Sequence, residues 1–244
     1  QLSYKDTGIA GGKGASLGEM TRAKMQVPPG FVILAAAFDR FLAETDLSAE
    51  IAAVLKKVNY QDLNSVDRAS NIIRDLIHDK AMPADIEKEI LAEFRKLSGK
   101  PHPDPLLSKE REFFVAVRSS ATAEDSAVAS WAGELETYLD TTEKKLIENV
   151  KKCWSSLFTP RAIFYRQEKK LLKTKVSVAV VVQQMVESEV SGVAFTVHPV
   201  TKDKNQMIIE AGSGLGEAIV SGQVTPDAYV IDKRDRSILD INIA

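Results

Sequence analysis

The sequence has few of the residues that nucleophilic, redox and zinc chemistry use. Its 244 residues include one cysteine and three histidines. Because Cys153 has no cysteine partner in this chain, no internal disulfide can form, which is typical of a reducing compartment. Its place beside Trp154 indicates a small core residue. None of His78, His102 and His198 has a partner at the spacing of a zinc site or a nucleophile pair, so we expect structural or solvated roles for all three.

The sequence also lacks an excess of charge and a long apolar run. Lys and Arg number 32 against 34 Asp and Glu, a net charge of -2, so nothing in the balance favours binding to nucleic acid or to a membrane surface. No apolar stretch has the length needed to cross a bilayer, and no secretory signal opens the chain. With 44% apolar and 27% charged residues the composition is that of a globular protein, and we expect a cytoplasmic location.

Helix and strand patterns both recur along the chain, which predicts an α+β fold. Pro83 followed by Asp85 and Glu87 marks the start of a helix. The β-branched run 176–182 is typical of a central strand, and the proline-rich stretch 100–105 separates a helical layer from the part that holds most motifs. Periodicity predicts helices over 14–25, 35–97, 143–157 and 161–172, and strands over 31–34, 113–117, 176–182, 192–196, 207–210 and 228–232.

The two ends of the sequence lead us to expect an incomplete chain. It begins at Gln1 without an initiator methionine. It stops at Ala244, just after the alternating stretch 238–241, which has the pattern of a strand. We expect the sheet that contains this strand to continue in the intact protein.

A glycine-rich motif, GGKGASLG over 11–18, has the chemistry to hold phosphate. Glycines leave backbone N–H groups open to an anion, the helix that follows directs its positive end at the same place, and Lys13 adds a charge. The spacing is not that of a Walker A loop. The alternative is an ordinary glycine turn before a helix.

A second motif, VRSSATAED over 117–125, places an arginine at the end of a hydrophobic strand. Arg118 is followed by hydroxyl residues, a combination that suits the binding of phosphate oxygens. The alternative is an arginine paired with Glu124 or Asp125 in a polar loop.

Three further motifs leave two interpretations each. Gly133 in SWAGELETY (130–138) suits a flap over a nucleotide or a hairpin turn. The stretch 183–187 (QQMVE) could offer backbone groups to a purine, although the sequence alone favours a core position for its methionine. In EAGSGLGE (210–217) a dinucleotide-binding fingerprint fails because Glu217 stands where the last glycine belongs, and the two flanking acids suit Mg²⁺ or a ribose hydroxyl instead.

Taken in order, these motifs resemble those of the phosphoenolpyruvate synthase family, and are similar as well to those of pyruvate phosphate dikinase and rifampin phosphotransferase. The resemblance runs from Leu2 to Asp232. It implies an ATP-grasp-like nucleotide-binding domain of two lobes, 1–180 and 181–244, with ATP between them and the second lobe incomplete. The stretches that carry it are 11–18, VPPGF over 27–31, 117–125, AGELET over 132–137, SGVAFT over 191–196, and 214–217 through 226–227.

The resemblance also implies roles for individual residues. Lys13 and Arg118 would be catalytic, holding the phosphates of ATP with a bridging Mg²⁺. The nucleotide-binding set would comprise Gly12 and Thr122 near the phosphates, Gly133, Glu134 and Thr137 in a flap, Gln183, Met185 and Val186 in an adenine hinge, and Glu210 and Glu217 facing the nucleotide.

In such enzymes ATP phosphorylates a histidine on a separate domain, and that histidine passes the phosphate to pyruvate on a third domain. The resemblance places the family's metal-binding segment and both partner domains beyond Ala244, so we assign no metal ligand here. Trp131 stands where phenylalanine is commoner, and 211–213 (AGS) where an aromatic residue is usual. The final acceptor therefore stays open between pyruvate, an antibiotic and a glucan, and a regulatory module that binds nucleotide without transferring phosphate is the alternative.

Overall fold

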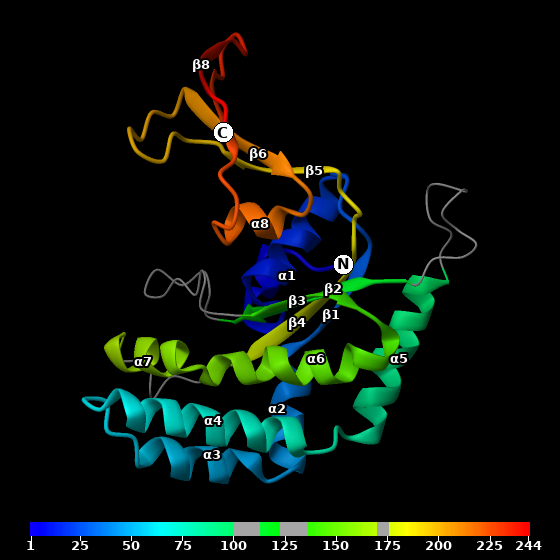
Figure 1. The fold of residues 1–244 in the computed structure, drawn as a ribbon. Coiled ribbons are helices and arrows are strands. Elements are labelled where there is room, and N and C mark those ends of the chain that lie inside the picture. Colours follow the sequence, from blue (N-terminus) through cyan, green and yellow to red (C-terminus); the bar gives the residue numbers. More distant parts are fainter. Residues whose placement is uncertain (100–112, 123–135, 170–175) are drawn as a thin grey trace. The chain divides into compact units, whose positions relative to one another are not determined.

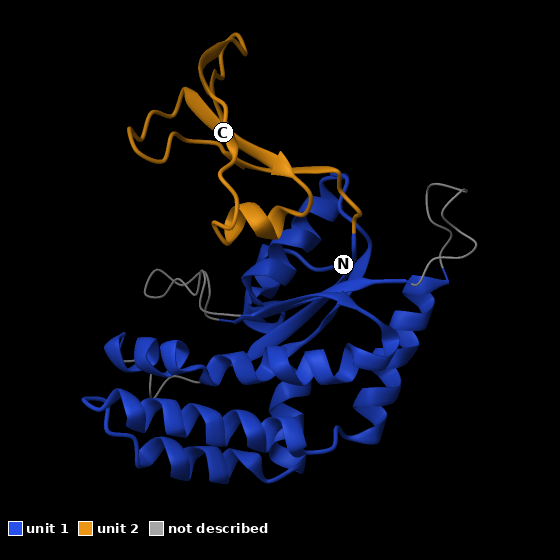
Figure 2. Cartoon of the chain, viewed as in Figure 1, with its two compact units in different colours: residues 1–185 blue, residues 186–244 orange. Residues whose placement is uncertain are grey.

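The computed structural model describes residues 1–99, 113–122, 136–169 and 176–244. The chain forms two compact units, 1–185 and 186–244, coloured separately in Figure 2. Helices and strands are mixed, which confirms the expected α+β class. The expected division after residue 180 falls inside a strand of the first unit, and as a statement about lobes it stays a prediction.

A four-stranded antiparallel sheet is the centre of the first unit. Its order is β1 (Gly30–Ile33), β4 (Val178–Gln184), β2 (Val115–Ala121) and β3 (Thr137–Thr141). Strand β4 is internal and buried along nearly its whole length, as its β-branched sequence predicted.

Helices cover both faces of this sheet. Helix α1 (Thr7–Arg22) packs against β2 and β4 on one face, and α2 (Ala35–Glu44) and α6 (Glu143–Ser155) pack on the other (Figure 1). Helices α3 (Leu47–Lys56) and α4 (Leu63–Asp79) form a further layer outside α6, in the range 35–97 where the pattern predicted helices. Helix α5 (Ala84–Ser98) packs against α6 and β1, and α7 (Pro160–Glu168) packs against α4.

The core of the first unit lies between the sheet and α2 and α6. The rings of Phe38 and Phe41 lie 5.4 and 5.1 Å from that of Trp154, centroid to centroid, and all three side chains are buried. Cys153 is fully buried beside them, which confirms its interpretation as a core residue. Burial raises the pKa of its thiol, and the charge of Glu136 raises it further.

The second unit is an antiparallel meander. Its strands β5 (Val190–Phe195), β6 (Gln206–Ser213), β7 (Asp227–Asp232) and β8 (Ile238–Asn242) pair in sequence order, and the short helix α8 (Gly216–Val220) packs against β5 and β6. A dinucleotide fold requires parallel strands, so this pairing agrees with the rejection of that fingerprint. Among the described residues, no helix combines the length and the apolar character that crossing a membrane requires.

Among the boundaries that differ from the sequence-based expectation, two concern the predicted phosphate-binding motifs. The helix expected over 14–25 spans Thr7–Arg22 and has a kink at Gly11. The sequence did not predict the helical residues before this kink. The strand expected over 113–117 spans Val115–Ala121, so the prediction that Arg118 leaves a strand end was wrong. Pairing with β4 extends β2 through small polar residues whose own propensity for a strand is low.

Candidate functional site

The glycine motif forms a kinked turn between two helical stretches. Gly11 has φ 69° and ψ 171°, a backbone conformation that almost no residue except glycine adopts. The chain leaves a short helical stretch at Ala10 and starts a new one at Gly12, immediately before Lys13. The start of a helix therefore lies where the sequence predicted a phosphate-binding turn.

This turn is bound to β2, which carries the arginine motif. The backbone N–H of Gly14 donates to Oγ of Ser120 at 3.2 Å, and the same hydroxyl donates to the carbonyl oxygen of Ala10 at 2.9 Å. Gly11 approaches so closely that a Cβ added to it would lie 2.2 Å from Oγ of Ser120. Two motifs that are more than a hundred residues apart in sequence therefore meet in the fold.

Arg118 lies on the same face of the sheet as Ser120. Alternate residues of β2, including Val117, belong to the core on the α6 side, so Arg118 and Ser120 take the α1 side. Across the sheet Arg118 pairs with Thr137 of β3 and with Val181 of β4, so Thr137 shares that face. The turn and strand bring together Gly12, Lys13, Arg118 and Thr137, whose roles toward a nucleotide stay predictions.

Lys13 is half-buried. Its charge lowers the pKa of the Cys153 thiol, although burial and Glu136 together raise that pKa more. The Cys153 Sγ contacts the carbonyl oxygen of Val117 in β2.

Thr122 is tied to the backbone of Ser177. Its Oγ1 donates to the Ser177 carbonyl oxygen at 3.1 Å and accepts from the Ser177 N–H at 3.3 Å. Ser177 in turn donates to Oδ1 of Asp39 in α2 at 3.1 Å. A threonine hydroxyl has one hydrogen, so in this arrangement it is not offered to a phosphate oxygen.

The residues expected to contact adenine are also tied to neighbours. The side-chain amide of Gln183 donates to the carbonyl oxygen of Pro28 at 3.1 Å, and its backbone pairs with β1 and β2. The N–H of Met185 donates to the carbonyl oxygen of Phe114 at 3.0 Å. Met185 is half-buried, and Val186 is exposed at the start of the second unit.

The two acids of the second glycine motif lie on different elements of the second unit. Glu210 is half-buried in β6, and Glu217 is exposed in the first turn of α8. Over the described ranges no group of three or more His, Cys, Asp or Glu side chains is placed to hold a metal ion. Gly133 and Glu134 lie outside the described residues.

Of the three histidines, two make contacts that fit structural roles. His78 Nε2 lies 2.8 Å from Oγ of Ser155, and His198 Nδ1 accepts from the N–H groups of Val200 and Thr201. His102 lies outside the described residues.

Sequence reasoning gave no role to a polar cluster on the α6 side of the sheet. Arg74 of α4 pairs with Glu136 at 2.9 Å, and the hydroxyl of Tyr138 also donates to this carboxylate. Burial and Glu136 raise the pKa of Tyr138. An arginine at a helix position 62 residues before its partner leaves no local signal in the sequence.

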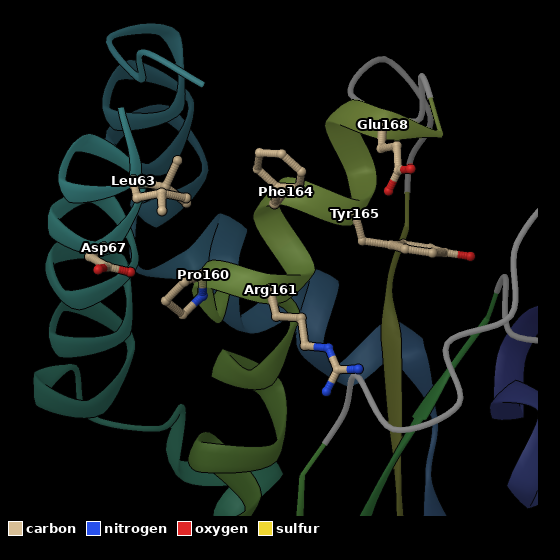
Figure 3. A pocket seen from close by; sticks show the side chains of 8 residues that line it. Leu63, Asp67, Pro160, Arg161, Phe164, Tyr165 and Glu168 are labelled. Carbon is tan, nitrogen blue, oxygen red and sulfur yellow. The ribbon is translucent and has the colours of Figure 1, made fainter. Parts of the chain in front are cut away.

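A pocket of about 360 Å³ lies between α4 and α7 (Figure 3). Its walls combine apolar and charged side chains, and none of the residues predicted for the site lines it. It therefore does not correspond to the motifs. The lining residues are Leu63, Val66, Asp67, Pro160, Arg161, Phe164, Tyr165 and Glu168.

Comparison with known proteins identifies the class of domain to which this chain belongs. The family model described as "Pyruvate phosphate dikinase, AMP/ATP-binding domain" matches residues 7–244, so the chain belongs to this family. Membership confirms the resemblance that the ordered motifs indicated.

The similar proteins are named as phosphoenolpyruvate synthases. "Probable phosphoenolpyruvate synthase" of Archaeoglobus fulgidus is 50% identical over 99% of this chain, and the protein of the same name from Methanocaldococcus jannaschii is 45% identical over 100%. "Phosphoenolpyruvate synthase" of Pyrococcus furiosus is 40% identical over 96%. The matches cover 31%, 20% and 32% of these relatives, in that order, so the chain spans about a third of their length or less.

Proposed function

We propose that this chain binds ATP and that Lys13 and Arg118 hold its phosphates. The observation that carries the proposal is the bond between Gly14 and Ser120, which joins the lysine-bearing turn to the arginine-bearing strand. Lysine supplies a compact positive charge and arginine a planar set of donors, a pairing that suits phosphate oxygens. The description of the family as an AMP/ATP-binding domain supports this assignment.

We propose that further residues contact the nucleotide around Lys13 and Arg118. Gly12 supplies backbone at the start of the helix, and Thr137 lies on the same face as Arg118. For the adenine we propose Gln183, Met185 and Val186. The N–H of Met185 now donates to the carbonyl oxygen of Phe114, and it can donate to the adenine ring only if that bond breaks. Glu210 and Glu217 are proposed to face the nucleotide, and with 1–180 and 181–244 as its two lobes the domain would be ATP-grasp-like.

In the intact protein we propose that this domain transfers phosphate from ATP to a histidine on another domain, and from there to pyruvate. The names of the relatives and their greater length support this route. Positioning and positive charge are the main sources of catalysis in phosphoryl transfer, and Lys13 and Arg118 supply charge. The single cysteine supports a cytoplasmic location.

Magnesium does not fit the described residues as a site made by the protein alone, because no cluster of three ligating side chains is present among them. We name no metal ligand among the described residues and propose that Mg²⁺ binds together with ATP. Magnesium usually reaches such sites together with substrate phosphates and one or two carboxylates.

Two measurements test the proposed function. Calorimetric titration of the intact protein with ATP and Mg²⁺ should give saturable binding, and the absence of binding would refute the ATP assignment. In the intact protein, ATP labelled at the transferred phosphate should label a histidine. ATP binding without labelling would favour the regulatory module, and transfer to an antibiotic instead of pyruvate would favour a rifampin phosphotransferase-like enzyme.

A further inference from the structure

We propose that Ser120 is a positioning residue: its hydroxyl caps the helix of the glycine motif from outside and so sets the position of Lys13 relative to Arg118. The consequence for ATP rests on the proposed function, whereas the capping itself does not. The capping is carried by the two hydrogen bonds of a single oxygen atom.

The helical stretch that begins after Gly11 has no cap of its own. A residue at the N-cap normally accepts, through its side-chain oxygen, the N–H of the second or third residue of the helix. Gly11 holds the N-cap position and has no side chain. Gly14, three residues further on, donates its N–H to Oγ of Ser120 instead. Strand β2 therefore supplies the cap.

The same hydroxyl holds the other side of the kink. Oγ of Ser120 donates to the carbonyl oxygen of Ala10, the last residue before Gly11. Only a group that donates and accepts through one atom can make both bonds, and serine is the smallest such residue. Ala10, Gly14 and Ser120 are all buried, so water is poorly placed to replace either bond.

The cap holds the backbone of Lys13 at a set position relative to the backbone of Arg118. Lys13 directly precedes Gly14, and Arg118 lies two residues before Ser120 on the same face of β2. The bond from Gly14 to Ser120 is therefore a short link between the backbones that carry the two charges. Groups that are already in place when a phosphate arrives bind it more tightly, because less ordering is needed on binding.

The test compares Ser120→Ala with a matched control, Ser156→Ala. Ser156 is also a fully buried serine of the first unit, and its Oγ donates to the carbonyl oxygen of Cys153 at 2.7 Å, away from the glycine turn. Both variants are titrated with ATP and with adenosine. We expect Ser120→Ala to weaken ATP by about tenfold, as for the loss of a positioning bond, and to leave adenosine unchanged. Equal weakening of ATP and adenosine, or wild-type binding of both, would overturn the proposal.

A double-mutant cycle separates positioning from general damage. If Ser120 acts through Lys13, the effect of Ser120→Ala on ATP binding should largely vanish in a Lys13→Ala background. Additive effects would show that Ser120 does not act through Lys13. If Ser120→Ala does not fold, Ser120→Cys replaces it, because cysteine keeps a weak donor and acceptor of similar size. The cycle is then read in the same way: an effect that vanishes in the Lys13→Ala background supports the proposal, and additive effects contradict it.

Amide hydrogen exchange in the absence of nucleotide tests the cap independently of ATP. The N–H of Gly14 should exchange faster in Ser120→Ala than in wild type or Ser156→Ala. If wild type binds no ATP and Gly14 still loses protection in Ser120→Ala, the proposed function fails and the cap stands. If the Gly14 amide keeps its protection, the cap is wrong whatever the result with ATP.

Discussion

Arg74 of α4 lies 2.9 Å from the carboxylate of Glu136, the residue that precedes β3. Both side chains are about three-quarters buried, with 26% and 29% exposed. The ion pair ties the outer helical layer to the sheet strand that pairs with Arg118. The strand that carries the proposed phosphate site is therefore supported through β3 from the opposite face.

Replacing Arg74 by alanine should destabilise the first unit. Glu136 would keep only the hydroxyl of Tyr138 as a side-chain partner in the part of the chain that the structure describes, and we expect a loss of about 1–2 kcal/mol in the free energy of unfolding. Chemical denaturation measures it. The matched control is Arg40→Ala, which removes an exposed arginine that pairs with Glu44 and Asp85. A loss no larger than that of the control would contradict a structural role for the Arg74 pair.

Gly11→Ala should be among the most damaging single changes in the chain. The added Cβ would meet Ser120 at 2.2 Å in a backbone conformation that alanine disfavours. We expect a loss of about 3 kcal/mol or more, measured as the free energy of unfolding. Gly8→Ala is the control, because nothing lies within 4 Å of its added Cβ, and it should leave stability equal or raised. Equal stability of Gly11→Ala and wild type would show that the kink is not required.

The fold was predictable where its cause is local in the sequence. The β-branched run over 176–182 predicted β4, and Pro83 with its following acids predicted the start of α5. The kink at Gly11 was not predictable, because the group that holds it, the hydroxyl of Ser120, lies more than a hundred residues away. The second half of β2 was missed for the same reason, since its pairing with β4 decides its conformation.

In the candidate site, too, local features could be predicted from the sequence and long-range contacts could not. The motifs named Lys13, Arg118 and Thr122, but the sequence did not show which polar groups are already used inside the fold. Thr122 is bound to Ser177, 55 residues further on, and Gln183 to Pro28, 155 residues earlier. Such bonds depend on tertiary packing and have no local pattern.

Thr122→Val should lower stability and leave ATP binding unchanged. The valine has the same shape but removes both hydroxyl bonds to Ser177, at a cost of about 1–2 kcal/mol. Denaturation and titration with ATP on the same protein separate the two effects, with Thr122→Ser as the variant that keeps the hydroxyl. Weaker ATP binding at unchanged stability would instead mean that this hydroxyl contacts a phosphate.

His78 should make the first unit less stable as the pH falls below neutrality. Burial lowers the pKa of His78, and the nearby charges of Arg74, Lys152 and Lys151 lower it further. The unfolded chain therefore binds more protons than the folded one between about pH 7 and pH 5, so stability is present above the ordinary histidine pKa and is lost below it.

The variant His78→Gln tests this directly. It should reduce the fall in the free energy of unfolding between about pH 7 and pH 5, and should leave the change between about pH 8 and pH 7 as in wild type. The same fall in the variant would assign the pH dependence to other groups.

The most direct test of the central claim is calorimetric titration of wild type, Lys13→Ala and Arg118→Ala with ATP. Controls are Lys56→Ala, on the exposed surface of α3, and Arg40→Ala, both of which remove one charge from the first unit away from the glycine turn. We expect the two site variants to bind ATP at least about tenfold more weakly, as for the loss of a charge-assisted bond, and the controls to bind as wild type. Wild-type affinity in folded Lys13→Ala and Arg118→Ala would contradict the account.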